Sequence, residues 1–327
     1  MAIGLLGTGS YVPERVVTNE EIASLVTDAT PEWILGKTGI EARRWAAPEE
    51  ATSDLAATAA VRALERAGLH ADQVDYLILS TSTGDHPQPP TACLVQNLIA
   101  AHGAACFDVN AVCAGFVYGL ELARSLVSAN PGTHALVIAS DVYSRILDFG
   151  DRRTSVLLGD GAGAAVVGEV ESGGIIDVDL SSYGESQELI KVVAGGSRVP
   201  TTAQTVADGG HYFTMQGRGV RDFVMDNLPP LLDKLLTNNG LELSDVDCFV
   251  PHQANGLLLR ELAVRSGLEN AHTHLVVDRL GNMGSASVPV ALDDAVRTGR
   301  INAGDLVLLA GFGGGMSVGT SLVRWSG

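Results

Sequence analysis

Three polar residues in this sequence, Cys113, His252 and Asn282, stand in short motifs that could support acyl chemistry. Cys113 is followed by Ala114 and Gly115 and then by the segment 117–127, which has helical spacing. A thiol at the start of a helix faces unpaired N–H groups and the positive end of the helix dipole, so we expect a reactive thiolate. A buried structural cysteine in a strand-to-helix turn is the alternative interpretation.

The histidine and asparagine motifs narrow the chemistry to two possibilities. His252 follows a short apolar strand, and Pro251 predicts that this strand has ended and that His252 lies in a turn. Asn282 lies in a Gly/Ser-rich turn, 281–289, before a predicted helix. In a papain-like protease, histidine deprotonates cysteine and asparagine orients histidine, but the local signature of that family is absent. Alternatively, histidine and asparagine donate to one thioester oxygen and stabilise an enolate as carbon dioxide leaves.

A glycine-rich segment, 311–319, follows the predicted strand 306–310 near the end of the chain. Its three consecutive glycines, 313–315, let backbone N–H groups approach a ligand with no Cβ in the way. The functional interpretation is an oxyanion hole shared with the Cys113 N–H. A glycine hairpin without a ligand is the alternative.

An internal repeat predicts how these motifs are positioned. The segments 68–76 and 240–248 match each other, and the same shift along the chain superposes the apolar runs 135–139 and 307–311. Each half contains helix, strand, site loop, helix and strand, with the first helices expected at 54–67 and 221–239. This order predicts an α/β fold with parallel sheets and ligands at the carboxyl ends of strands.

The repeat also predicts two domains and the place of the site between them. We expect an N-terminal half, 1–172, that carries the nucleophile, and a C-terminal half, 173–327, that carries the histidine, the asparagine and the glycine-rich loop. In the register of the repeat, Cys113 aligns with Ser285, which lies shortly after Asn282.

Composition excludes several classes of function. The chain of 327 residues has a formal net charge of −17, so we expect no nucleic-acid partner, because binding nucleic acid needs a basic footprint. The four cysteines form no CxxC pair, and the first residues are too short for a secretory leader. No apolar run approaches the roughly 18 residues of a membrane span. We therefore expect a cytoplasmic protein with reduced thiols, no membrane partner, no metal and no redox cofactor.

Six motifs taken in order resemble the β-ketoacyl-acyl carrier protein synthase III family over nearly the whole chain. Each motif alone has little specificity, whereas all six in order are highly specific. They are Trp33-Ile34 with Thr38-Gly39-Ile40, Cys113-Ala114-Gly115-Phe116, Gly159-Asp160-Gly161-Ala162-Gly163-Ala164, Pro251-His252-Gln253-Ala254-Asn255, Gly281-Asn282 and Gly313-Gly314-Gly315.

The resemblance implies a homodimeric thiolase fold, a layered α-β-α-β-α sandwich, and a ping-pong reaction. Cys113 would take an acyl group from acyl-CoA, and malonyl-acyl carrier protein would then enter. His252 and Asn282 would promote decarboxylation, and the N–H groups of Cys113 and Gly314 would hold the tetrahedral oxyanion. The resemblance also implies that four residues bind substrate. Trp33 and Arg152 would flank the CoA adenine, Asn255 would help to position the donor groups, and Lys37 would also contact substrate.

Departures from the family pattern suggest an unusual substrate. Lys37 stands where the family often has arginine, and Leu257 stands where a basic residue is thought to dock the carrier protein. Gln88 replaces a phenylalanine in a loop that shapes the acyl pocket across the dimer interface, and Met283 replaces a threonine. Gln88 and Met283 together suggest a starter other than acetyl, as in the priming of a polyketide.

Two further hypotheses about function remain beside condensation and proteolysis. Some relatives pass the acyl group to a hydroxyl or an amine without decarboxylation, and Leu257 favours this mildly while Asn282 disfavours it. A non-catalytic subunit that shapes the pocket of another synthase would have lost its nucleophile, whereas this chain has Cys113.

Overall fold

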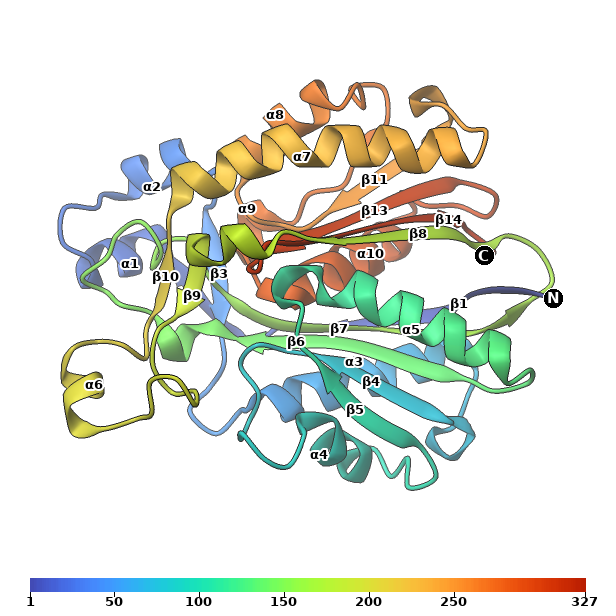
Figure 1. Ribbon diagram of the computed structural model, residues 1–327, viewed down its shortest axis with the longest axis horizontal. Coiled ribbons are helices and arrows are strands. Elements are labelled where there is room, and N and C mark those ends of the chain that lie inside the picture. Colours follow the sequence, from blue (N-terminus) through green and yellow to red (C-terminus); the bar gives the residue numbers. More distant parts are fainter.

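The computed structural model describes residues 1–327 and contains two five-stranded sheets stacked with helices between and outside them (Figure 1). The strand order is β1-β7-β6-β4-β5 in the first sheet and β8-β14-β13-β11-β12 in the second. The first sheet contains β1 (Ala2–Tyr11), β4 (Tyr76–Ser80), β5 (Ala105–Val109), β6 (Ala135–Val142) and β7 (Asp160–Val170). The second contains β8 (Gly174–Ser182), β11 (Cys248–Pro251), β12 (His272–Thr273), β13 (Leu306–Gly313) and β14 (Ser317–Arg324).

Helices complete a sandwich of five layers, as the expected thiolase fold requires. In Figure 1 the central layer lies between the sheets, and the outer layers cover their far faces. The central helices are α5 (Gly115–Ala129) and α10 (Ser287–Arg297), and the outer ones are α3 (Thr52–Ala67) and α4 (Thr91–Leu98) on one side, α7 (Gly217–Asn238) and α8 (Gly256–Arg265) on the other. Both central sheet strands, β6 and β13, are buried along their full length, as expected for strands covered on both faces.

The predicted repeat is confirmed in register. Strand β4 begins at Tyr76 and strand β11 at Cys248, which are the equivalent last positions of the two matching segments, and both sheets have the same strand order. The first helix of each half is also found, although α7 begins at Gly217 rather than at residue 221. All strands of the first sheet end by residue 170, and all strands of the second begin at or after residue 174.

Small residues explain how α3 approaches the first sheet closely. The buried side of α3 is rich in alanine, with Ala59 and Ala63 fully buried. A Cβ on Gly7 would lie 2.7 Å from the Ala63 carbonyl oxygen, and one on Gly9 would lie 2.5 Å from the Ala59 carbonyl oxygen. The glycines of β1 are therefore required by helix-to-sheet packing.

The sequence-based expectation about the end of β11 is wrong by one residue, although His252 lies beyond the strand as predicted. Pro251 is the last residue of β11 rather than a residue beyond it, because a terminal strand position with a parallel partner at Ala310 needs no N–H from the proline. The family motif that begins at Gly159 forms the start of strand β7 from Asp160 onward.

The most apolar helical stretch lies inside the molecule. Residues 112–129 are long and apolar enough to cross a membrane by length and composition, and half of this window is buried in the structure. Because α5 packs between the two sheets, its apolar composition is explained by the core.

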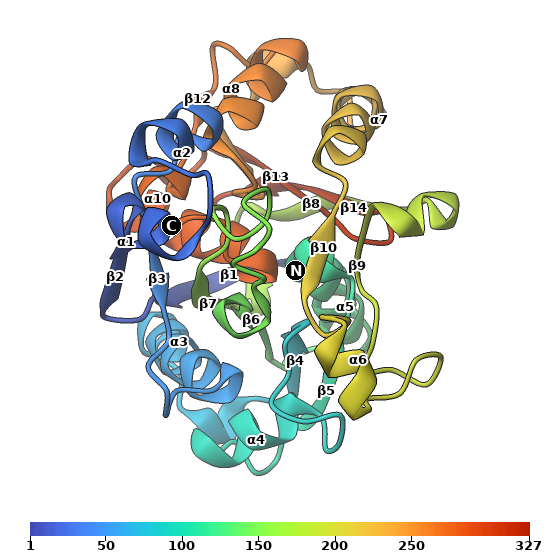
Figure 2. The same ribbon diagram turned by 90° about the vertical axis from the view of Figure 1, so that its left-hand side faces the viewer.

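Smaller elements cover the end of the sandwich where the sequence places the site (Figure 2). The segment 13–45 and the excursion 190–215 both lie at this end, and the excursion extends away from the sheets (Figures 1 and 2). The elements are β2 (Arg15–Thr18), α1 (Asn19–Leu25), α2 (Pro31–Thr38), β3 (Ala42–Trp45), β9 (Ile190–Val192), α6 (Ala203–Ala207), β10 (Phe213–Met215) and α9 (Val277–Leu280).

Candidate active site

Cys113 occupies a sharp turn between β5 and α5. It is the middle residue of a 3-10 turn, η2 (Val112–Ala114), which leads directly into α5. Val112 has a φ of 47°, which is unusual for a β-branched residue and indicates a strained turn. The turn presents Cys113 at the helix start with only 8% of its surface exposed.

His252 is the first residue after β11, and backbone and packing contacts hold it. Its N–H donates to the Ala310 carbonyl at 2.7 Å, which fixes the turn against β13. Its ring packs edge-on against Phe312, with the ring centres 5.2 Å apart. The side chain is 2% exposed, and burial lowers its pKa to about 3, so the ring is neutral at physiological pH.

Asn282 is held on both sides of its backbone. Its N–H donates to the Leu157 carbonyl at 2.9 Å, and its carbonyl accepts from Gly159 N at 2.8 Å. Its side-chain Oδ1 accepts a hydrogen bond from Gly284 N at 2.9 Å. Because Oδ1 is used in this way, the Nδ2 group is the part of the amide that is free to donate to a substrate.

The three predicted residues line one small cavity together with the glycine-rich loop. The cavity has a volume of about 40 Å³. Its wall is otherwise mostly apolar. The lining residues are Cys113, Tyr143, Leu158, Ile190, Phe213, Met215, Val220, His252, Ala254, Asn282, Phe312 and Gly313.

The backbone around Cys113 is shaped for an oxyanion. A Cβ on Gly313 would lie 2.7 Å from the Cys113 N atom, so only glycine fits here. The N–H groups of Cys113 and Gly314 donate to no other backbone group. The Cys113 amide is therefore an available donor at the cavity, whereas Gly313 rather than Gly314 is the residue of the glycine-rich loop that lines it.

The electrostatics of Cys113 differ from the sequence-based expectation of a thiolate. Burial, and secondarily the negative charge of Asp141, raise the pKa of the Cys113 thiol, and its own backbone N–H lowers it only partly. Burial of the sulfur thus outweighs the helix start. Because the pKa of His252 is lowered by burial, the resting pair is a neutral thiol and a neutral imidazole, unlike the ion pair of a cysteine protease.

A wider cavity of about 560 Å³ leads from the surface toward the site and shares Asn282 and Phe312 with the inner cavity. Trp33, Lys37, Arg152 and Asn255, four of the predicted substrate-binding residues, all line this outer cavity. This outer cavity is therefore called the entrance to the inner cavity.

Three of the residues that line the entrance make cation–π or hydrogen-bond contacts within the protein. The Arg152 guanidinium lies over the Trp33 ring, 4.8 Å from its centre, so an adenine would have to separate the pair to stack between them. Asn255 caps α8 by accepting from Leu257 N and Leu258 N, and its Nδ2 donates to the Lys37 carbonyl at 3.1 Å. Asn255 thus ties the histidine turn to the end of α2.

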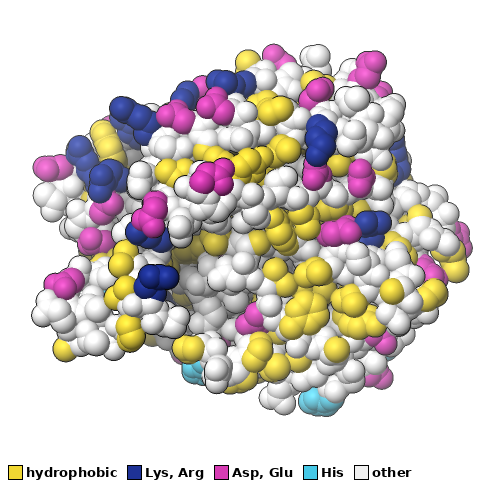
Figure 3. Space-filling model, in the orientation of Figure 1, with side chains coloured by type: hydrophobic (Ala, Val, Ile, Leu, Met, Phe, Trp, Pro, Cys, Tyr) yellow, Lys and Arg dark blue, Asp and Glu magenta, His cyan; other side chains and the backbone are white.

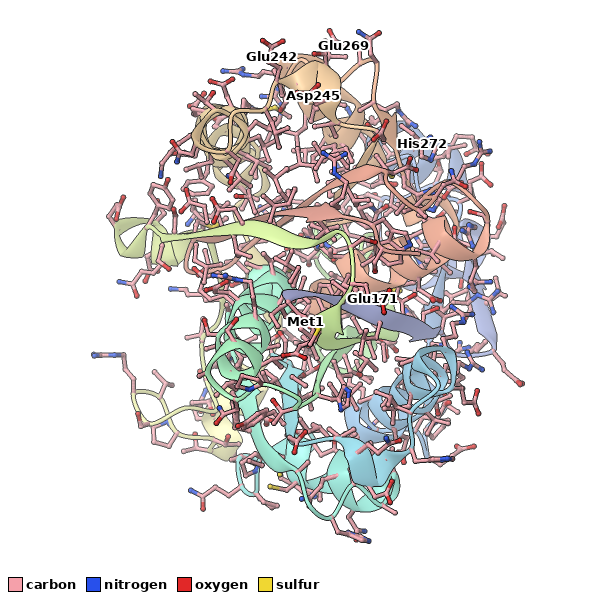
Figure 4. All side chains as sticks on the ribbon, turned by 90° about the vertical axis from the view of Figure 1, so that its right-hand side faces the viewer. Met1, Glu171, Glu242, Asp245, Glu269 and His272 are labelled. Atoms are coloured by element: carbon pink, nitrogen blue, oxygen red, sulfur yellow. The ribbon has the colours of Figure 1, made fainter.

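The entrance has a different charge from the rest of this acidic chain. Lys and Arg side chains gather on the side of the molecule where α2 lies (Figure 3). A second surface cavity, which shares Lys37, Arg153 and Arg221 with the entrance, is lined by five basic and three acidic residues. They are Lys37, Arg153, Lys191, Arg218 and Arg221 with Asp151, Glu188 and Asp222. At the opposite end of the molecule, Glu242, Asp245 and Glu269 point outward together (Figure 4). The entrance therefore favours an anionic substrate or partner.

Two of the predicted substrate-binding residues lie elsewhere. Met283 is fully buried in the core. Its side chain points away from the cavity and packs on Gly161, where an added Cβ would lie 2.7 Å from the Met283 sulfur. Gln88 is exposed in the loop 86–90 and lines neither the entrance nor the inner cavity of its own chain. The prediction that Met283 contacts substrate is not supported by its position.

Three side chains at the site were not predicted from the sequence. Tyr143 and Phe213 line the inner cavity and contact each other edge-on at 5.6 Å between ring centres. Asp141 is completely buried beneath the Asn282 turn. Asp141, the only charged residue in the buried run of β6, was the one available signal, since a lone acid in such a strand calls for an explanation.

Comparisons with known families and proteins identify the family of this chain. The model of the 3-oxoacyl-[acyl-carrier-protein (ACP)] synthase III family matches residues 107–184, and the model of its C-terminal part matches residues 236–325. The two models thus contain Cys113, His252 and Asn282, and together they cover more than half of the chain.

Similar proteins cover the whole chain. It is 47% identical to an acetoacetyl CoA synthase of Streptomyces sp. (strain CL190), over 98% of both chains. It is 42% identical to a β-ketoacyl-[acyl-carrier-protein] synthase III of Clostridioides difficile, over 99% of this chain and 98% of that one. Among solved structures, a priming β-ketosynthase of a polyketide biosynthetic pathway aligns with a TM-score of 0.92 and 34% identity, over 99% of this chain and 97% of that chain.

Proposed function

Because the chain belongs to the 3-oxoacyl-acyl carrier protein synthase III family, we propose that Cys113, His252 and Asn282 catalyse its condensation of an acyl group with a malonyl unit. The observation that supports these roles is that all three side chains line one cavity with the glycine-rich loop. The product is a β-ketoacyl thioester that initiates fatty acid or polyketide synthesis. Acyl transfer to a hydroxyl or an amine is not favoured.

The first half-reaction loads the enzyme. The Cys113 sulfur attacks the carbonyl carbon of acyl-CoA, a sulfur–carbon bond forms, and the bond to the CoA sulfur breaks. The thiol proton passes to the neutral His252 ring and then to the departing CoA sulfur. The N–H groups of Cys113 and Gly314 stabilise the tetrahedral oxyanion.

The second half-reaction uses the other half of the site. His252 and the Nδ2 of Asn282 donate to the malonyl thioester oxygen, and the electron pair of the breaking carbon–carbon bond becomes an enolate as carbon dioxide leaves. The enolate carbon attacks the acyl carbonyl on Cys113, the carbon–sulfur bond of the acyl-enzyme breaks, and the departing sulfur takes a proton from solvent water. A neutral His252, which the lowered pKa of about 3 provides, is the form that can donate without already carrying a charge.

The size of the inner cavity suggests a short starter. Its volume of about 40 Å³ is only a few times the roughly 10–15 Å³ that a cavity of this kind needs to hold one water molecule. The side chains of Tyr143, Phe213 and Ile190 line the cavity and separate it from a neighbouring cavity of about 190 Å³, which they also line. The Streptomyces relative is named for an acetoacetyl product, whose acyl part has four carbons. Such a product fits the addition of a two-carbon unit to a two-carbon starter. This proposal differs from the sequence-based hypothesis of a non-acetyl starter, which rested on Gln88 and Met283; of these, Met283 does not line the cavity.

A panel of acyl-CoAs tests the loading step and the starter together. We expect intact mass to show one acetyl adduct, lost in Cys113→Ala, and little adduct with hexanoyl-CoA. An enzyme that loads hexanoyl as fast as acetyl would contradict the short starter. An enzyme that loads no acyl group at all would contradict the role of Cys113.

The carrier of the malonyl unit has a second candidate, malonyl-CoA. Leu257, which stands where the family has a basic docking residue, is 43% exposed at the entrance, and the 47% identical relative is named for a CoA product. Malonyl-acyl carrier protein remains the first candidate, because the entrance is basic and the family name specifies it. Rates with each malonyl donor at equal concentration distinguish the two.

We also propose that the protein forms a homodimer and is located in the cytoplasm. Strand β5 is an unpaired sheet edge, with Phe107 partly exposed and Leu98 of the adjacent α4 53% exposed, so a second copy could cover this edge as a homodimer. Light scattering after size exclusion would give the mass of two chains. A cytoplasmic location suits an enzyme that needs the free thiol of Cys113.

A further inference from the structure

Asp141, at the end of β6, is a buried carboxylate with no cation beside it. It is completely buried, and its six hydrogen bonds all come from neutral donors. Its Oδ1 accepts from the loop after β4, namely from Thr81 Oγ1, Ser82 N, Ser82 Oγ and Thr83 Oγ1. Burial raises the pKa of Asp141, and hydrogen bonds to its oxygens oppose that shift by stabilising the carboxylate. Such a group is costly to bury, so its full set of donors indicates a specific role.

The other carboxylate oxygen holds the turn that carries Asn282. Asp141 Oδ2 accepts from Ser285 N at 2.8 Å and from Ser285 Oγ at 2.7 Å. Ser285 follows Gly284, whose N–H donates to Asn282 Oδ1 at 2.9 Å. A Cβ on Gly284 would lie 2.5 Å from Asp141 Oδ2. The carboxylate and the turn are therefore in direct contact.

We infer that Asp141 is a positioning residue for decarboxylation, clamping the Gly284–Ser285 turn so that Asn282 presents its Nδ2 to the malonyl thioester oxygen. This inference rests on the proposed function of Asn282. Asp141 comes from the N-terminal half and Ser285 from the C-terminal half, 144 residues away, so the clamp joins the two halves at the site. Because Asp141 does not contact the substrate cavity, it acts only through the turn and through its charge.

The charge of Asp141 gives a second, independent readout. It raises the pKa of the Cys113 thiol, although burial contributes more. The other titratable groups near Cys113 are Tyr143, whose pKa is raised by burial and by Asp141, and His252, which is neutral. Loss of the Asp141 charge should therefore shift the alkylation of Cys113 by iodoacetamide to lower pH.

Two substitutions separate the clamp from the charge. Asp141→Asn removes the charge and replaces one acceptor oxygen with an NH2 group, which then faces hydrogen-bond donors instead of accepting from them. Ser285→Ala removes one hydrogen bond to the carboxylate and keeps the charge. Asp293→Asn is the control for loss of a buried carboxylate elsewhere, because Asp293 bonds to Thr8 and Ser10 and pairs with Arg66 and Arg297, away from the cavity.

Single-turnover loading from acetyl-CoA and release of labelled carbon dioxide from malonyl thioester by the loaded enzyme are measured for each variant. For Asp141→Asn we expect decarboxylation to fall on the order of 10²-fold, as for loss of one oriented oxyanion donor, with loading kept and alkylation shifted to lower pH. For Ser285→Ala we expect decarboxylation to fall several-fold, up to about 10-fold, with loading and the alkylation profile unchanged. Asp293→Asn should change none of the three.

Equal losses of loading and decarboxylation in Asp141→Asn with an unchanged alkylation profile would overturn the inference, as would normal decarboxylation. If Asp141→Asn does not fold, Ser285→Ala decides: a loss confined to decarboxylation supports the clamp, and normal decarboxylation overturns it. Failure of the proposed function would look different, because wild-type enzyme would then neither load acetyl nor release carbon dioxide.

Discussion

Cys113 and Ser285 occupy equivalent positions in the two halves of the molecule. Each is the middle residue of a three-residue 3-10 turn at the start of a central helix, and the register of the repeat aligns them. The residue before each has a left-handed backbone, with a φ of 47° at Val112 and 57° at Gly284. Upstream, Asn110 and Asn282 also correspond, and the Oδ1 of each accepts from the N–H two residues on.

The residue that faces each turn is different. Gly313 stands against Cys113, and Asp141, its equivalent in the register of the repeat, stands against Ser285. The glycine leaves the Cys113 N–H free for a substrate oxyanion, whereas the carboxylate occupies the Ser285 N–H. One duplicated turn is thus open for covalent chemistry, and the other is closed and serves to hold Asn282.

Cys113→Ala should produce the largest effect, because it removes the nucleophile from the open turn. Acyl loading should fall by at least about 10³-fold. Carbon dioxide release from malonyl thioester should persist, since His252 and Asn282 belong to the other half. Mass spectrometry and release of labelled carbon dioxide measure the two steps. If both disappear together in a folded variant, the division of labour between the halves is wrong.

Substitution of the two equivalent asparagines tests the asymmetry directly. Asn282→Ala should reduce decarboxylation by about 10²–10³-fold, since it removes an oriented donor from the developing enolate. Asn110→Ala should change neither loading nor decarboxylation by more than a few fold, because its hydrogen bond to Val112 N is long, at 3.3 Å, and exposed to solvent. Comparable losses in both variants would show that the two turns are functionally alike.

Gly313→Ala tests whether the open turn must stay open. The added Cβ would meet the Cys113 N atom at 2.7 Å and the Cys113 Cβ at 2.8 Å. Loading should fall by about 10²-fold through displacement of the oxyanion donor. Gly196→Ala, where nothing lies within 4 Å of an added Cβ, is the control and should leave loading unchanged. Normal loading by Gly313→Ala would show that the turn tolerates a side chain.

The smallest expected effect concerns stability. Because burial lowers the pKa of His252 to about 3 from 6.5, the unfolded chain binds more protons at this residue between these pH values. Stability from this group is present above pH 6.5 and is lost as the pH falls, by up to about 1.4 kcal/mol per pH unit. Urea unfolding from pH 6 to pH 4 should therefore show a steeper loss in wild-type enzyme than in His252→Gln. Equal slopes would mean that His252 titrates normally.

Sequence motifs predicted the parts of this site that depend on local order. The register of the repeat located β11 and β13, and three motifs located Cys113, His252 and Asn282, because each follows a recognisable strand or precedes a helix. Residues whose role depends on distant partners were not predictable. Asp141 bonds to a serine 144 residues away, and no local pattern indicates that contact.

Two other features were decided by the three-dimensional surroundings. Whether the pKa of Cys113 is raised or lowered depends on burial, which the position at a helix start does not reveal. The side to which Met283 points depends on the geometry of the turn after Asn282, and the neighbouring Gly161 makes room for it in the core.

The most direct test of condensation uses enzyme loaded with acetyl on Cys113 and freed of CoA. This enzyme is mixed with malonyl-acyl carrier protein or malonyl-CoA in one turnover, and both products are weighed. We predict a β-ketoacyl thioester whose mass is that of the malonyl thioester plus acetyl minus carbon dioxide, on at least one carrier, with loss of the acetyl group from the enzyme. An acetyl group that stays on Cys113 with both carriers, or leaves it without carbon dioxide release, would contradict condensation.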